Sequence, residues 1–157
     1  MTIRLEITPI GTERSVRVMR DIANRAVNLY VPLQYIAHDF ERIMARQFAT
    51  EGASTGTPWR PLSDKWLQHK IDVGKDHGIL QYNQALVESL TDRGARGAVR
   101  HVDSDSVDLG TTIWYGIFHV EGTRKMPRRN FMRIPANTQR HWIAVVQRYI
   151  LTGSLYR

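Results

Sequence analysis

The residues that could do chemistry are six histidines and the carboxylates near them. None of the histidines has the HExxH or HxH spacing that would place two metal ligands on one face. His119 and Glu121 would share a face if they lay on a strand, and could then pair a base with a carboxylate in a small hydrolase or nuclease. A polar surface pair is the simpler interpretation of this spacing, and we favour it.

A cluster of aspartates offers the other chance of chemistry. Asp103, Asp105 and Asp108 match a calcium loop only in number, because the DxDxDG order and the glutamate at the twelfth position are missing. Aspartate and serine side chains also bond their own backbone, so these residues indicate a turn. No serine has a GxSxG context, and neither GxxxxGK[ST] nor GxGxxG occurs. We therefore expect a protein that is not an enzyme, with no catalytic, cofactor-binding or metal site.

Tryptophans and a basic segment could instead bind a partner. Trp114 and Trp142 lie in apolar patterns and are expected in the core, whereas Trp59 lies in a Gly/Pro-rich loop and either closes the edge of the domain or meets a partner. Five cations fall within residues 124–133. This segment is either a solvated loop or a surface for DNA or an acidic neighbour. It has no recognition helix and no interleaved aromatics, so sequence-specific DNA binding is not expected.

The charge is distributed unevenly. The net charge of +7 comes from a C-terminal quarter, residues 122–157, with eight Lys/Arg and no Asp/Glu, whereas the first 121 residues have a net charge of −1. Such asymmetry indicates a negatively charged partner, namely DNA, an acidic protein surface or anionic lipid. The absence of cysteine excludes disulfides and thiolate metal sites. No apolar run of about 18 residues or signal peptide occurs, so we expect a soluble protein made inside the cell.

The hydrophobic periodicity predicts the elements that position these residues. Alternation over residues 3–7 predicts a strand. Residues 18–30 and 32–50 predict two amphipathic helices, which either pack on a sheet or fold back on each other. Pro32 should end or kink the first helix, and it also suits the first turn of the second. Residues 51–61 form a loop, and Ser63 caps a short helix. A further helix is expected over residues 83–90.

The second half of the chain contains a predicted hairpin. Residues 99–102 and 107–111 read as strands joined by a turn at 103–106, and residues 113–120 favour a helix over a strand. Residues 123–135 form a basic loop or edge strand. A last helix is capped by Asn137 and ended by Gly153. The chain is thus expected to be one α+β domain, residues 1–157, with a small, mostly antiparallel sheet packed with two long N-terminal helices and a C-terminal helix.

Several short motifs occur in a recognisable order. Phe48 and Gly52 precede the stretch WRPLS at 59–63, which is followed by GIL at 78–80, ALVESL at 85–90, VDLGT at 107–111, WYGIFHVEG at 114–122 and MPRRNFM at 126–132. This order resembles the phage virion morphogenesis or tail completion family of Mu-like and related phages, and the broader tail-component family of long-tailed phages. The chain departs from the usual pattern at Val120, where glutamine is common, and at Asn130, where proline is common.

The resemblance implies a structural virion protein that completes the tail or joins it to the head. Such a subunit works in a homo-oligomeric ring, with a hexamer favoured, alongside other neck and tail proteins. It is made in the host cytoplasm and has no membrane partner. The basic quarter would line a lumen that passes DNA, or dock on an acidic ring. The alternative is a nonspecific nucleic-acid-binding protein, whose affinity would fall steeply with salt.

The resemblance also implies roles for single residues. His119 would hydrogen-bond backbone, Phe131 would fill a core or interface pocket, and Gly122 and Pro127 would belong to the same structural motif. The candidate interaction residues are Trp59, Arg124, Lys125, Arg128, Arg129, Phe131 and Arg133.

Overall fold

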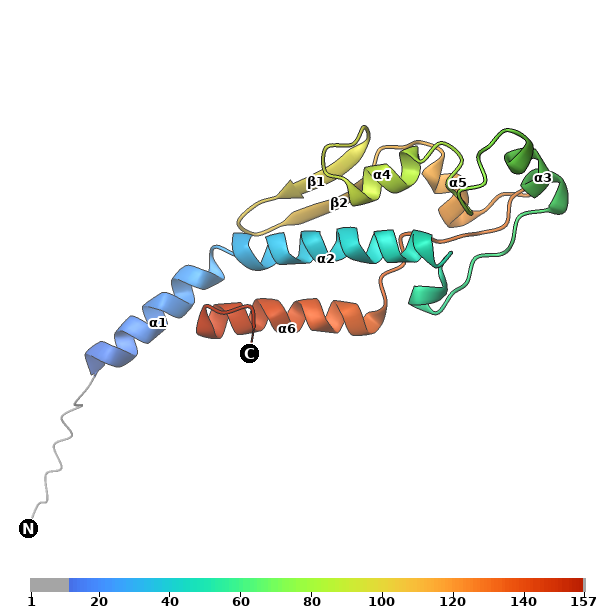
Figure 1. Ribbon diagram of the computed structural model, residues 1–157. Helices are drawn as coiled ribbons and strands as arrows, with labels where there is room; N and C mark the ends of the chain where they lie inside the picture. Colours follow the sequence, from blue (N-terminus) through green and yellow to red (C-terminus); the bar gives the residue numbers. More distant parts are fainter. Residues whose placement is uncertain (1–11, 157) are drawn as a thin grey trace, which may run out of the picture.

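The computed structural model describes residues 12–156, so the strand predicted at residues 3–7 lies outside the described residues. The elements are α1 (Thr12–Ala26), α2 (Tyr30–Ala49), a 3₁₀ turn η1 (Ala53–Thr55), α3 (Asp64–Asp72), α4 (Ala85–Thr91), β1 (Ala98–Val102), β2 (Val107–Thr111), α5 (Gly116–Glu121) and α6 (Ala136–Thr152). The predicted α+β class is confirmed, with α2 as the longest element (Figure 1).

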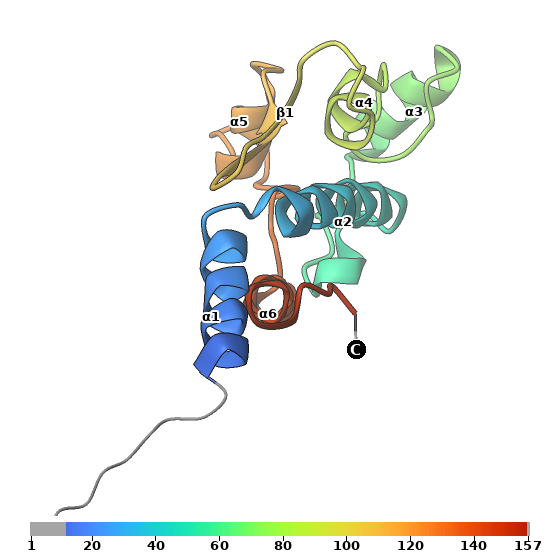
Figure 2. The same ribbon diagram turned by 90° about the vertical axis from the view of Figure 1, so that its left-hand side faces the viewer.

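Helix α2 is the central element of the fold. It lies between the β1–β2 hairpin on one side and α6 on the other (Figures 1 and 2). Its apolar stripe is buried and meets residues from later loops and from α4, which together form the core. Pro32 lies in the first turn of α2, where a missing amide donor costs nothing. The buried core cluster consists of Phe40, Met44, Phe48, Trp59, Ile79, Leu86, Leu90 and Phe131.

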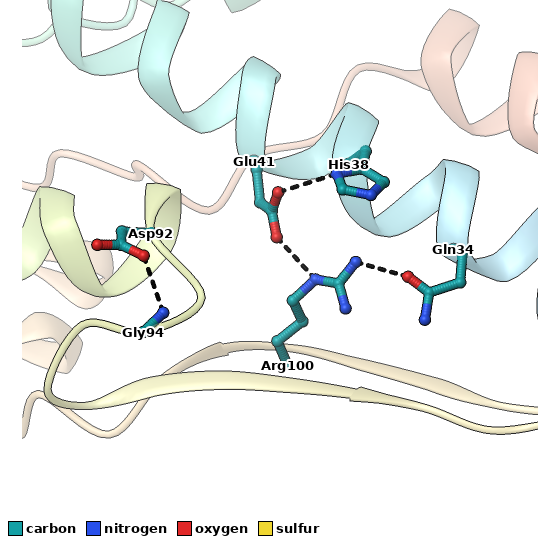
Figure 3. Close-up of polar contacts among 6 residues, drawn as sticks. All are labelled: Gln34, His38, Glu41, Asp92, Gly94 and Arg100. Carbon is teal, nitrogen blue, oxygen red and sulfur yellow. Dashed lines mark hydrogen bonds and ion pairs between the residues drawn. The ribbon is translucent and has the colours of Figure 1, made fainter.

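The two strands form an antiparallel hairpin whose register runs from the pair Ala98–Thr111 to the pair Val102–Val107. An ion pair holds this hairpin on α2: Arg100 Nε lies 2.7 Å from Glu41 Oε1, and Arg100 Nη2 donates to Gln34 Oε1 across 2.7 Å (Figure 3). Within residues 12–156 the sheet has two strands. The hairpin is therefore tied to the central helix by an ion pair and a hydrogen bond.

Helices α1 and α6 do not cover the sheet, in contrast to the predicted arrangement. Helix α6 packs on α2 on the side away from the hairpin, and α1 packs on α6 and extends beyond the body (Figures 1 and 2). The Arg25 guanidinium joins α1 to the end of α6, donating to the carbonyls of Ile150 and Leu151 across 2.8 and 3.1 Å. No residue of α1 is buried. The apolar stripe of α1 is thus only partly used within the subunit.

Most predicted element ends agree with the structure, but those of the first helix do not. That helix spans Thr12–Ala26 rather than residues 18–30, so it ends well before Pro32. The Ser63 hydroxyl accepts a hydrogen bond from the Trp66 amide at the start of α3, and Gly153 ends α6 at a φ of +76°. The short helix predicted near residues 113–120 is α5. The prediction of Asn137 as the cap of α6 is wrong, because the helix begins at Ala136 and its N-cap is Pro135, two residues earlier. No side chain caps this end of the helix.

Candidate assembly surfaces

The basic segment, residues 123–133, is not a free loop but is fixed to the body by its backbone. The Arg129 amide donates to the His119 carbonyl across 2.7 Å, and the Gln47 side chain donates to the Asn130 carbonyl across 3.0 Å. Gly122 starts the segment at a φ of +79°, and a β-carbon there would lie 3.0 Å from the Arg128 amide nitrogen. Gly122 is therefore required both by its conformation and by this close approach.

Arg129 is buried and holds the segment against the preceding loop. Its Nε and Nη2 donate to the carbonyls of Arg60 and Pro61 across 2.8 and 3.0 Å. Burial, together with the positive charge of Arg60, lowers the pKa of Arg129 from its usual value. A guanidinium still stays charged in proteins, so Arg129 is a fixed positive charge inside the domain rather than a surface contact.

Trp59 and Phe131 are core residues, which corrects their expected place on the interaction surface. Both rings pack on Phe48, with centroids 5.3 and 5.9 Å away. Trp59 thus closes the edge of the domain, one of the two interpretations of its loop position, and Phe131 fills the core. Among the predicted surface residues the side chains left exposed are Arg124, Lys125, Arg128 and Arg133.

The basic segment forms one wall of an open groove of about 1100 Å³. Pro127 and Met126 belong to this wall, and no Asp or Glu lines the groove. The buried ammonium of Lys70 donates to the Gly78 carbonyl, and burial lowers its pKa. We call this site the basic groove, and its cationic and aromatic lining residues are Arg60, Lys70, Arg124, Lys125, Arg129, Trp66, Tyr82, Tyr115 and His119.

The sequence indicated only one wall of the basic groove. Arg60 and Lys70 lie in stretches of ordinary mixed charge and come to the groove through the fold. The rings of Trp66 and Tyr82 stack at 5.9 Å between centroids although 16 positions separate them in the chain. A run of charge in the sequence reveals local clusters, whereas this lining is assembled from distant segments.

His119 and Glu121 do not form a base–carboxylate pair. They lie on helix α5 rather than on a strand, so two positions turn them by roughly 200° around the axis. The His119 ring is half-buried and its Nδ1 has no hydrogen-bond partner, which differs from the expected bond to backbone. Burial first, and then the charge of Arg129, lowers the pKa of His119.

Helices α1 and α5 lie at opposite ends of α2 (Figure 1), and exposed apolar side chains form a surface at each of them. The first is the α1 stripe, defined by Val16, Met19 and Val27, in which Met19 is 68% exposed. The second, the α5 patch, is defined by Trp114, Ile117 and Phe118. Trp114 is 75% exposed, so the expectation that it is a core residue is wrong. An apolar run in one sequence looks the same whether it faces a core or a partner.

Residues 12–156 hold no group of three or more His, Asp or Glu arranged to bind a metal ion. Over the same residues, no helix has the length and apolar character needed to cross a membrane.

Comparison with known proteins gives one match. The model of the phage virion morphogenesis family matches residues 11–150. Searches of curated proteins and of solved structures found no match. The match covers nearly the whole chain, including both apolar surfaces and the basic groove. The chain therefore belongs to the phage virion morphogenesis family, and its role is structural or morphogenetic in a phage virion.

Proposed function

We propose that this protein is a non-enzymatic ring subunit that completes the tail of a tailed phage or joins the tail to the head. Membership of the phage virion morphogenesis family supports a place in the virion. The observation that carries the ring is the pair of apolar surfaces, the α1 stripe and the α5 patch, at opposite ends of the subunit.

Two different surfaces at opposite ends favour a head-to-tail contact. Each added copy uses one of its two surfaces and leaves the other free. The assembly is therefore complete only when the last copy meets the first and the copies form a closed ring. Exposed apolar surface of this kind on a soluble subunit marks a contact with another molecule. A stable contact of this class buries on the order of 1,500 Å² in total. The α1 stripe of one copy would cover the α5 patch of the next.

The ring has a proposed place and a proposed set of neighbours. Six copies would match the sixfold symmetry of a phage tail, and the faces of the ring would meet other neck and tail proteins. The exposed cations Arg128 and Arg133 lie outside the basic groove. They would contact packaged DNA in the lumen or an acidic neighbouring layer. The subunit is made in the host cytoplasm and enters the virion as part of the tail or neck.

Light scattering after size exclusion, at 50 and 500 mM salt and with purified tails, tests this function. We expect a discrete multimer, or a monomer that assembles on tails. Met19→Glu places a charge in the α1 stripe and should abolish assembly without unfolding the subunit. Asn24→Glu adds the same charge to a different side of α1 and should assemble normally.

The alternative, a nonspecific nucleic-acid-binding protein, predicts other results. A wild-type protein that stays monomeric even with tails, and that binds duplex DNA tightly at 50 mM but not at 500 mM salt, would support the alternative. If Met19→Glu and Asn24→Glu assemble to the same extent, the α1 stripe is not part of the contact between copies. Phe118→Ala should weaken assembly with little loss of stability, whereas Phe131→Ala should cost about 3–5 kcal/mol of stability.

A further inference from the structure

An exposed acidic tip stands at the hairpin end of the molecule. We define it as residues 103–108, in which Asp103, Asp105 and Asp108 are exposed. Asp103 pairs with His101 across 2.7 Å, and neither Asp105 nor Asp108 has an ion-pair partner within residues 12–156. The Asp103 amide donates to the Ser106 carbonyl across 2.9 Å, so the turn is well formed. The tip is a compact negative surface at the end of a hairpin that is tied to α2.

The basic groove is the opposite kind of surface. Arg60, Arg124 and Lys125 are exposed there, and none of them has a carboxylate partner in the described part of the chain. Lys70 and Arg129 add buried positive charges, which backbone carbonyls hold in place. Groups fixed in this way lose little conformational freedom when an anionic partner arrives.

Each charged surface is continuous with one of the two apolar surfaces. The Leu29 amide, at the junction of α1 and α2, donates to the Ser104 carbonyl across 2.6 Å, so the acidic tip adjoins the α1 stripe. Tyr115 and His119 line the basic groove, and the Trp114 ring of the α5 patch lies edge-on to Tyr115 with centroids 5.8 Å apart. The turn of the hairpin lies beside the α1–α2 junction, at the opposite end of α2 from α5 (Figure 1). A head-to-tail contact of the α1 stripe with the α5 patch therefore also brings an acidic tip toward a basic groove.

We propose that in the assembled ring the acidic tip of one copy lies in the basic groove of the next copy. This inference rests on the proposed ring function and names the charged part of its contact. The occupant is a second copy because the chain itself supplies the complementary charge, beside the apolar surface that the ring already uses. A hairpin end is narrow, with strands roughly 5 Å apart, so it suits an open groove of about 1100 Å³. Opposite charges aligned in this way select one orientation of the two subunits.

Charge reversal and charge exchange test the contact. Arg124→Glu/Lys125→Glu and Asp103→Lys/Asp105→Lys should each raise the subunit concentration at half-assembly about tenfold or more, because like charges then face each other. One chain with all four substitutions has the charges exchanged and should assemble close to wild type. Arg96→Glu/Arg140→Glu changes the net charge by the same amount as the groove variant, at two exposed positions outside the groove, and serves as the control. Assembly is measured by light scattering at 50 mM salt, and folding by thermal unfolding.

The outcomes separate this inference from the function on which it rests. If the four-substitution chain assembles no better than the two reversal variants, the acidic tip is not the occupant. Loss of assembly in the groove variant alone would mean that the groove takes another anion, such as DNA or an acidic segment of another virion protein, and would also overturn the inference. If the charge variants assemble normally while Met19→Glu does not, the proposed ring is supported and the contact between the acidic tip and the basic groove is overturned. A wild-type protein that never assembles, even on tails, overturns the ring itself.

Discussion

The indole N–H of Trp142 donates a 2.7 Å hydrogen bond to the buried carboxylate of Asp39. This contact joins α6 to α2 across 103 positions of the chain. The other oxygen of the same carboxylate pairs with Arg42, one turn further along α2. A carboxylate that has lost its water needs such partners, since an unmet acceptor keeps its full desolvation cost.

Replacing Trp142 with phenylalanine should lower the free energy of unfolding by about 1–3 kcal/mol. The ring still packs between the helices, but Asp39 loses one donor. Urea unfolding at a fixed protein concentration measures the loss. Trp114→Phe is the matched control, because Trp114 is exposed in the subunit and should cost little. Equal losses in the two variants would show that the hydrogen bond to Asp39 contributes nothing specific.

Substitutions at two glycines in the loop after α2 should distinguish the cost of backbone strain from the cost of steric crowding. Gly52 and Gly56 have φ values of +85° and +74°, but only at Gly52 would a β-carbon meet neighbours, the Trp59 indole at 2.6 Å and the Thr57 carbonyl. Gly56→Ala should therefore cost about 1 kcal/mol from conformation alone. Gly52→Ala should cost about 3 kcal/mol or more, because Trp59 must also leave its place in the core. Thermal unfolding of both variants checks the order, and similar costs would contradict it.

The stability of the subunit should decrease as the pH falls below about 6.5. Burial and Arg129 lower the pKa of His119 in the folded state, so the unfolded chain binds the proton more readily. The stability linked to neutral His119 is fully present above the unfolded pKa and is lost as the pH falls through the folded pKa. Unfolding of wild type and His119→Gln at pH 5.5 and 7.5 tests this. The free energy of unfolding of the wild type should fall relative to that of His119→Gln at the lower pH. A difference between the two proteins that does not change with pH would contradict the assignment.

The sequence was a good guide to elements that local patterns define. The stripe of Leu33, Ile36 and Phe40 predicted α2, Ser63 predicted the start of α3, and the aspartates near residue 105 predicted the hairpin turn. Each of these depends on residues a few positions apart, whose spacing directly reflects helix or strand geometry. The strand predicted at residues 3–7 stays a prediction.

The candidate site was less predictable because it depends on contacts between distant segments. Five cations within ten residues suggested one exposed surface, yet Arg129 turns inward to the Arg60 and Pro61 carbonyls, about 70 positions away. Trp114 and Trp142 occur in similar apolar patterns, but Trp142 packs against the core and Trp114 faces outward. Sequence periodicity identifies an apolar face without showing which molecule covers it.

The Arg25 contact with the Ile150 and Leu151 carbonyls joins a helix that is synthesised early to one that is synthesised late. A ribosome makes α1 early, but the carbonyls that fix it appear only when α6 is nearly finished. A chain that ended before Ile150 would lack both acceptors, so α1 would lose these two hydrogen bonds to α6. The placement of α1 is therefore completed late in synthesis, by residues about 125 positions further along the chain.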